Sequence, residues 1–228
     1  MLPTPLSRRI ARWSPSALLA ALVALLGALA TVLLALPTVT ADAAPPQTTA
    51  SVVRPVTADG TPAEGWTVER LGVKVDCDGS AMPAVDGGIA ACFPTAVGLR
   101  ACWASGPHHA LCLQDAGTEQ KLVRVRVHGA FPTATKPAVP EPLALHLADG
   151  QDCLLRIGGA WGAPKDHPNW IGHYSCTDGA VYAPAKSITG IDQRGPVWKV
   201  KVWDGKKTIT KVRVVSASFV GTAETAPQ

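Results

Sequence analysis

Apolar and charged side chains alternate with a period of two residues along several segments of this chain, and this pattern constrains the fold more than any other feature. In KLVRVRVH, residues 121–128, valines occupy every second position and basic residues lie between them. The same alternation is present in residues 143–147, 198–203 and 211–215. Side chains along a β-strand point alternately to opposite faces, so a period of two indicates strands with one buried face. The sequence therefore predicts a protein that is mainly β.

Turn signals separate the predicted strands. Asp204-Gly205 lies between two alternating segments, and an Asp-Gly pair in that position is a strong hairpin signal. Residues 100–115 predict a second hairpin, which turns at SGPHH. Glycine and proline interrupt the chain frequently, and no window of about a dozen residues has the pattern of an amphipathic helix. We therefore expect a single antiparallel β-sandwich or barrel-like domain with disulfide-stapled loops.

Residues 1–43 have the pattern of a signal peptide. Three arginines precede an almost unbroken apolar run that ends at Pro37, and Ala41-Asp42-Ala43 then supplies small residues for a signal peptidase. The prediction is cleavage after Ala43 or Ala44, followed by secretion or residence in the cell envelope. A run of about twenty apolar residues can also span a bilayer, so an uncleaved membrane anchor is the alternative.

Composition divides the rest of the chain into three parts. Residues 44–63 are rich in Pro, Thr and Ala, and we expect them to form a flexible linker. Residues 64–222 have the length of one domain and are expected to form the β-domain. Residues 223–228 resemble the linker in composition and are expected to be a disordered tail.

All six cysteines lie beyond the predicted signal peptide. An even number of cysteines in an exported chain indicates disulfides. The sequence contains no C-x-x-C pair, so it gives no support for a thioredoxin-like redox site or a paired zinc knuckle. The SGPHH turn places Cys102 and Cys112 symmetrically on facing strands, and Cys153 and Cys176 bracket a loop rich in Gly and Pro. The predicted pairs are therefore Cys102–Cys112, Cys153–Cys176 and, as the remaining pair, Cys77–Cys92.

A set of short motifs lies between residues 66 and 222. RACW is followed by LCL, and then by DGQDCLLRIGGAWG, HYSC, GPVWKVKV and a closing ASFVGT. In these motifs the chain resembles small exported disulfide-containing proteins of actinobacteria, of the mycobacterial kind. The resemblance implies a secreted or envelope location. That group has no established activity, so the resemblance implies no reaction, no cofactor and no catalytic residues.

The common signatures of hydrolases are missing from the sequence. There is no G-x-S-x-G elbow, and the aspartates that could serve a glycosidase lie among Gly and Pro, where turns favour Asp. A cysteine nucleophile is disfavoured because all six thiols have plausible disulfide partners. A catalytic triad is recognised by geometry, so a secreted hydrolase with a site assembled from residues distant in sequence is the alternative function.

The loop between the last two cysteines carries the candidates for a metal site, Asp166, His167 and His173. Neutral imidazole suits zinc or copper. However, the spacing of the two histidines across Pro168 is no recognised ligand pattern, and a third ligand is not evident. We therefore predict no metal and no cofactor, and these three residues are the candidates if a metal binds.

The same loop carries three aromatic side chains, Trp161, Trp170 and Tyr174, which are candidates for ligand binding. Flat apolar rings can stack on sugars, and aromatic side chains often anchor protein interfaces. The alternative is that these rings fold inward as a small core beneath the loop.

A basic segment at residues 199–213 is the second candidate binding site. It holds six basic residues against one acidic residue, a net charge of +5, whereas the chain from residue 44 onward holds eighteen against sixteen, a net charge of +2. Such a surface suits anionic wall polymers or lipid head groups, and the alternative is a solvated face whose lysines discourage edge pairing. Antiparallel pairing would gather four of these side chains on one face: Lys199, Lys201, Lys211 and Arg213.

These features favour an exported binding or interaction module of the cell envelope over an enzyme. The expected partners are an anionic cell-wall polymer, lipid head groups or another envelope protein. The export signal and the modest net charge argue against nucleic acid, and membrane contact is expected only through an uncleaved N-terminal segment. A secreted inhibitor is a third interpretation, because disulfide-clasped loops are good scaffolds for inhibitors.

Overall fold

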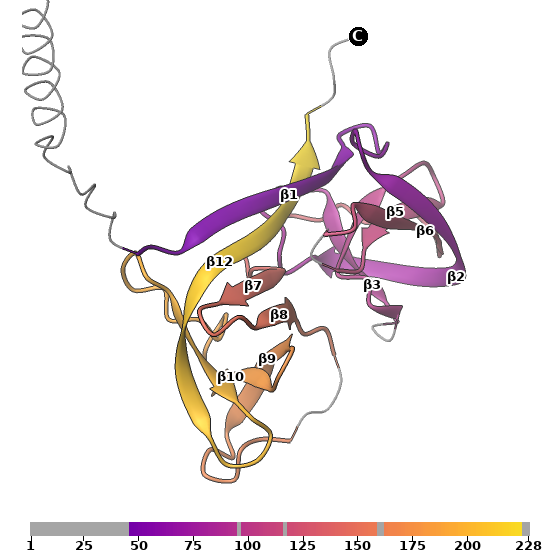
Figure 1. Ribbon diagram of the computed structural model, residues 1–228. Coiled ribbons are helices and arrows are strands. Elements are labelled where there is room, and N and C mark those ends of the chain that lie inside the picture. Colours follow the sequence, from indigo (N-terminus) through magenta and orange to yellow (C-terminus); the bar gives the residue numbers. More distant parts are fainter. Residues whose placement is uncertain (1–45, 95–96, 116–117, 159–161, 225–228) are drawn as a thin grey trace, which may run out of the picture. The chain divides into compact units, whose positions relative to one another are not determined.

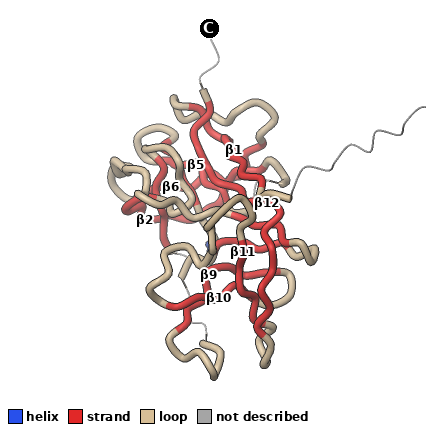
Figure 2. The backbone as a smooth tube through the Cα atoms, turned by 90° about the vertical axis from the view of Figure 1, so that its left-hand side faces the viewer, coloured by secondary structure: helices blue, strands red, loops and turns tan. Residues whose placement is uncertain are grey.

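The computed structural model describes residues 46–94, 97–115, 118–158 and 162–224, and the predicted signal peptide lies outside this part of the chain. Figure 1 shows the strands that make up almost all of the regular structure, and Figure 2 shows the loops that join them. The strands are β1 (Thr49–Thr57), β2 (Thr67–Ser80), β3 (Ile89–Phe93), β4 (Ala101–Ala104), β5 (His109–Leu113), β6 (Lys121–Val127), β7 (Ala144–Leu147), β8 (Asp152–Leu155), β9 (Trp170–Cys176), β10 (Ala180–Pro184), β11 (Lys199–Trp203) and β12 (Ile209–Ala223). The prediction of a mainly β, barrel-like protein is confirmed.

Strands β2 to β6 form a closed barrel. Strands that follow one another along the chain pair in antiparallel fashion, and the ring closes where β6 lies parallel to β2. The parallel pairing contains a register shift between Arg70 and Lys74 of β2. One continuous segment of the chain, residues 67–127, therefore builds the whole of this first barrel.

Strands β7 to β12 form a second ring. They pair in chain order, and β12 also pairs with β7, which closes the ring. Strand β1 adds to β12 as a parallel strand, with Thr49 opposite Ser216 and Thr57 opposite Ala223. Figure 1 shows β1 and β12 side by side. Because β12 is fifteen residues long, its first part can pair with β11 and its later part with β7 and β1.

Each ring has a core of its own, because one face of every strand carries small or aliphatic side chains. The core of the first barrel draws on its own strands and connections, with the buried residues Val75, Cys92, Leu99, Cys102, Ala110, Cys112, Val123, Val125 and Val127. The core of the second ring contains Leu145, Leu147, Cys153, Leu155, Tyr174, Val181, Val200, Val202, Val212, Val214 and Ala217. A third cluster combines residues of both, including Trp103, Leu111 and Leu122 with Leu143 and Val220. The outer faces of the two rings therefore meet in an apolar contact.

The alternating segments form strands with the predicted buried face. Every second residue of β6, from Val123 to Val127, lies in the core of the first barrel. The two predicted hairpins are also present, as β4–β5 and β11–β12. In the second hairpin the Asp204 carboxylate accepts hydrogen bonds from the backbone N–H groups of Lys206, Lys207 and Thr208, at 2.8, 3.0 and 3.1 Å. These bonds hold the turn closed.

All three predicted disulfides are present: Cys77–Cys92, Cys102–Cys112 and Cys153–Cys176. Each joins two residues that lie directly opposite one another on neighbouring antiparallel strands. The disulfides therefore tie β2 to β3, β4 to β5, and β8 to β9. Within the described residues no cysteine is free.

The expected flexible linker at residues 44–63 is wrong for the segment that forms β1. Residues 49–57 pair along their length with β12, and Val56 is fully buried in the cluster shared by the two rings. The reason is the distance to the partner strand. The residues of β12 that pair with β1 lie 166 or 167 positions later in the chain, so the composition around β1 does not reveal them. The β-domain therefore begins at β1 and extends to Ala223, while residues 225–228 of the expected tail lie outside the described part of the chain.

The part of the chain that the structure describes contains no helix long and apolar enough to span a bilayer.

Candidate functional site

The outer face of β11 and β12 carries the basic residues that the sequence singled out. Lys199 lies directly opposite Arg213, and Lys201 lies directly opposite Lys211. The three lysines are exposed and the arginine is partly buried. The valines between them belong to the core of the second ring, so the two-residue period fixes all four basic side chains on the outer face. The predicted gathering of these four residues is confirmed.

A groove of about 430 Å³ runs beside this face and is lined by Lys199, Lys201, Lys211, Arg194 and Asp192, together with residues of β10 and of the loop after it. The Asp192 carboxylate accepts two hydrogen bonds from the Arg194 side chain, at 2.8 and 3.0 Å. These bonds, with the positive charges of Arg194 and Lys211, hold the pKa of Asp192 well below its usual range. Four basic side chains less one carboxylate leave this lining with a net charge of +3.

An aromatic cluster lies beneath the basic face. The ammonium group of Lys201 lies 4.6 Å from the centroid of the Trp170 ring, and the His167 ring stacks on the same indole at 4.0 Å. Tyr182 and Trp203 meet edge to face at 5.2 Å. Trp170 is only 8% exposed, so its ring is already covered by protein groups. Trp170 therefore belongs to a small core and offers no free face to a sugar.

Tyr174 is a core residue of the second ring and is wrong as a surface candidate for ligand binding. Its side chain is fully buried, and its hydroxyl donates a hydrogen bond to the Pro142 carbonyl at 3.0 Å. Burial, with a smaller contribution from Glu141, raises the pKa of the Tyr174 phenol well above its usual value. The cause of its inward direction is a register shift in the β9–β10 pairing, which leaves His173 as an extra residue. Trp161, the third aromatic candidate, lies outside the described residues.

The three candidate metal ligands do not come together. Asp166 is exposed, His167 stacks on Trp170, and His173 is buried with its Nδ1 3.8 Å from Glu141 Oε2. Among the described residues, one group of three potential ligand atoms lies within 4.8 Å of one another, and its members are Cys92, Cys102 and Cys112. Their sulfur atoms are all in disulfides. The described residues therefore hold no assembled metal site.

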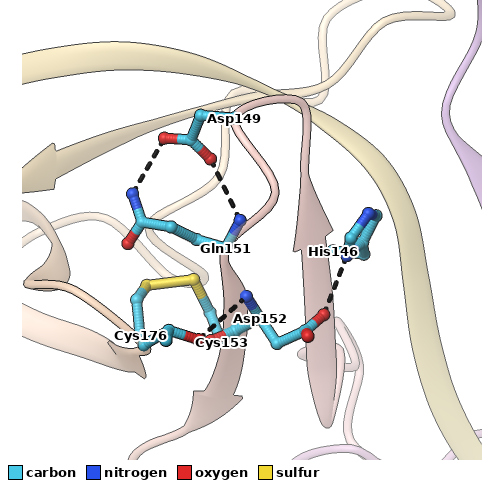
Figure 3. Close-up of polar contacts among 7 residues, drawn as sticks. His146, Asp149, Gln151, Asp152, Cys153 and Cys176 are labelled. Atoms are coloured by element: carbon cyan, nitrogen blue, oxygen red, sulfur yellow. Dashed lines mark hydrogen bonds and ion pairs between the residues drawn. A yellow bond between two sulfur atoms is a disulfide. The ribbon is translucent and has the colours of Figure 1, made fainter.

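A polar row that sequence reasoning missed crosses three strands of the second ring. His146 of β7 lies directly opposite Ser216 of β12 on one side and opposite Asp152 of β8 on the other. His146 Nδ1 lies 2.8 Å from Asp152 Oδ1, as Figure 3 shows. The Cys153–Cys176 disulfide begins at the next residue of β8 and ties that strand to β9. Ser216, His146 and Asp152 are the residue types that serve in a catalytic triad as the nucleophile, the base and the group that orients the base.

The surroundings of this row are open. Ser216, His146 and Asp152 line a pocket of about 450 Å³, to which Asp115 and Thr118 contribute from the first barrel. The His146 side chain is 47% exposed and the Asp152 side chain is 79% exposed. In serine hydrolases the aspartate of a triad is buried, which keeps its hydrogen bond to histidine away from water. The row therefore has the residue types of a triad without the shielding.

Comparisons with protein-family models, with curated proteins and with solved structures found no match to this chain. The arrangement of its side chains is therefore the basis for the function proposed below.

Proposed function

We propose that this protein is an exported cell-envelope binding module that holds an anionic cell-wall polymer against the basic face of β11 and β12. The observation that carries the proposal is the register of that hairpin, which sets Lys199 against Arg213 and Lys201 against Lys211 on one exposed face. The three disulfides support export, because disulfides persist in oxidising compartments.

The spacing of the charges supports a polymer with repeated anionic groups. The two cation pairs are separated by two residues along each strand, which corresponds to about 6.7 Å. A repeating polyanion can place successive charged groups on successive pairs. A single lipid head group would neutralise one cation pair and leave the two like charges of the other pair facing each other.

Repulsion among the basic side chains of this face also favours a bound polyanion. Like charges directly opposite one another on neighbouring strands are destabilising, and these two pairs have only Asp192 as a nearby carboxylate in the groove lining. A polyanion in the groove would remove this repulsion. Its affinity should fall as salt rises, because exposed charges are screened within about 8 Å at physiological ionic strength.

Binding to inorganic polyphosphate tests the proposal. The variant Lys199→Glu/Lys201→Glu/Lys211→Glu/Arg213→Glu should bind polyphosphate at least about tenfold more weakly than the wild type at low salt. A matched control reverses four exposed lysines outside the face, at Lys136, Lys165, Lys206 and Lys207, and should bind within a few-fold of the wild type. Equal losses in both variants would mean that net charge alone drives binding. Wild-type binding to vesicles containing phosphatidylglycerol, without binding to polyphosphate, would favour a lipid partner instead.

A second candidate function is ester or amide hydrolysis, favoured by the Ser216–His146–Asp152 row. In that reaction His146 Nε2 would accept the Ser216 proton while Asp152 holds Nδ1. A fluorophosphonate probe should then label the wild type and fail to label Ser216→Ala, whereas Ser218→Ala, which changes a serine of the same pocket, keeps the label. The 79% exposure of Asp152 makes binding the better supported of the two functions.

A further inference from the structure

A second group of basic side chains lies on β2, β5 and β6 of the first barrel. Arg70 of β2 is the register partner of Arg124 of β6. Arg126 of β6 is the register partner of Lys74 on β2 and of His109 on β5. The intervening valines of β6 fill the barrel core, so these five side chains share the outer face of the sheet.

The register shift in β2 opens a pocket beside these residues. Residues 71–73 of β2 lie opposite the single residue Val125 of β6, because Arg70 pairs with Arg124 and Lys74 with Arg126. Bulges of this kind redirect side chains and are common next to functional sites. The pocket measures about 380 Å³ and is lined by Arg70, Leu71, Gly72, His109, Arg124, Val125 and Arg126.

The charge of the pocket is not balanced by the protein. Its described lining contains three guanidinium groups and no carboxylate. Glu69, the acidic residue next to Arg70, forms an ion pair with Lys121. The ion pairs formed by the described residues do not include Arg70, Arg124 or Arg126. The arginines therefore repel one another in the free protein.

Arg124 adds an independent sign of a missing partner. Its Nε atom is buried and has no hydrogen-bond acceptor in the structure. An unsatisfied buried donor lowers stability. A guanidinium group can offer Nε and one terminal nitrogen side by side to two oxygens of one anion, and such an approach would satisfy the donor.

We propose that this pocket of the first barrel binds a compact tetrahedral dianion of the phosphate or phosphate-monoester type. Phosphate has the oxygen geometry that guanidinium forks recognise in pairs. Two negative charges set against three arginines reduce the net charge of the lining from +3 to +1. This site lies on β2, β5 and β6, whereas the polymer face lies on β11 and β12, so the two proposals involve different residues.

Calorimetric titration of the oxidised protein with inorganic phosphate tests the site. The wild type should bind one phosphate with a dissociation constant of about 1 mM or lower at low salt. Glycerol phosphate, a monoester dianion, should bind comparably. Dimethyl phosphate carries one charge fewer and should bind at least about tenfold more weakly. If the protein binds inorganic phosphate but does not bind glycerol phosphate, the ligand is limited to the free ion and the monoester assignment is overturned.

Two variants locate the binding. Arg70→Gln/Arg124→Gln should lose phosphate binding by at least about tenfold, because it removes the facing pair of guanidinium groups. Lys136→Gln/Lys165→Gln removes two exposed positive charges that line neither site and should leave phosphate binding unchanged, and loss of binding in this variant would overturn the assignment to the first barrel.

Gly72 offers a matched pair of variants that keeps the test independent of arginine removal. Its backbone φ lies outside the left-handed region, and a Cβ added there would meet nothing within 4 Å. Gly72→Glu places a carboxylate beside the arginines and should compete with phosphate, whereas Gly72→Gln has the same size without the charge. Weaker binding in the glutamate variant than in the glutamine variant supports the site. Equal binding in both, or no saturable phosphate binding by the wild type, overturns it.

Discussion

Lys199 of β11 lies directly opposite Arg213 of β12, on the exposed face of an antiparallel pair. Two like charges in this position lower stability unless an anion lies between them. The pair is therefore one of the places where the proposed binding function and the stability of the free protein oppose each other.

Removing one of these charges should stabilise the free protein. We expect Lys199→Met to raise the free energy of unfolding by about 0.2–1 kcal/mol at low salt, because it relieves the repulsion from Arg213. The gain should shrink as salt rises. Urea unfolding at two ionic strengths measures both effects. Lys206→Met, which removes a lysine from the hairpin turn, serves as the control and should change stability little under either condition. A destabilised Lys199→Met variant at low salt would contradict the argument.

The disulfide between Cys153 and Cys176 should be a major source of stability. Replacing both cysteines by serine should lower the free energy of unfolding by about 3 kcal/mol, because the bond closes a loop with a sequence separation of 23 residues. Urea unfolding of the oxidised proteins measures the difference. After full reduction of both proteins under denaturing conditions the difference should largely disappear, and its persistence would show that serine itself disturbs the core.

Gly179 should tolerate no side chain. Its backbone φ is +89°, and an added Cβ would lie 2.4 Å from the backbone oxygen of Trp203. We expect Gly179→Ala to destabilise the protein by clearly more than the roughly 1–2 kcal/mol of a left-handed residue alone, because the β10–β11 contact must also shift. Gly205→Ala is the matched control, since its φ is +77° and an added Cβ would meet nothing within 4 Å. Equal effects of the two substitutions in thermal unfolding would contradict the predicted clash.

Asp86 should make stability depend on pH in the acid range. A hydrogen bond from the backbone N–H of Thr222, followed by the bond and charge of Arg54, lowers the pKa of Asp86 below its ordinary value. The folded-state pKa is the lower one, so this stabilisation is present above the ordinary pKa of about 4 and is lost as pH falls through the folded-state value.

The variant Asp86→Asn tests this linkage. At pH 6 it should be less stable than the wild type, and the difference should shrink as pH falls below about 4. The Arg54 and Asp86 side chains are 45% and 37% exposed, so solvent screening limits the ion pair itself to about 1 kcal/mol or less. Asp178→Asn, at an exposed turn, is the control. A difference between Asp86→Asn and wild type that grows at low pH would reverse the assigned sign.

The exported protein should begin at Ala44 or Pro45, as cleavage after Ala43 or Ala44 requires. Cleavage there leaves β1 intact, because β1 begins at Thr49. N-terminal sequencing of protein from the culture medium and the wall fraction measures the start. An intact Met1 in a membrane fraction would favour the uncleaved anchor.

Local patterns predicted the features that depend on neighbouring residues. The alternation around Val123 and Val125 predicted a strand with a buried face, and the turns at Asp204 and Gly106 predicted two hairpins. Because a hairpin brings its two strands side by side, the sequence also predicted the Cys102–Cys112 disulfide and the gathering of the basic residues of β11 and β12 on one face.

Features that depend on distant pairing could not be predicted in this way. The pairing of His146 with Ser216 exists only because β12 closes the second ring against β7. Tyr174 points inward because a single extra residue in β9 reverses the alternation. The pocket beside Arg124 depends on a bulge in a strand that lies some fifty residues earlier. None of these three events leaves a signal within a window of ten or twenty residues.

The parallel pairing of β1 with β12 has a consequence for the order in which the chain can fold. The first barrel is continuous in sequence, so all of its strands are present once residue 127 has been synthesised. Strand β1 is synthesised before them, yet its partner β12 is the last strand of the described chain. Until β12 exists, β1 has no strand of the native structure to pair with. The second ring and the pairing of β1 are therefore completed together, by the same C-terminal strand.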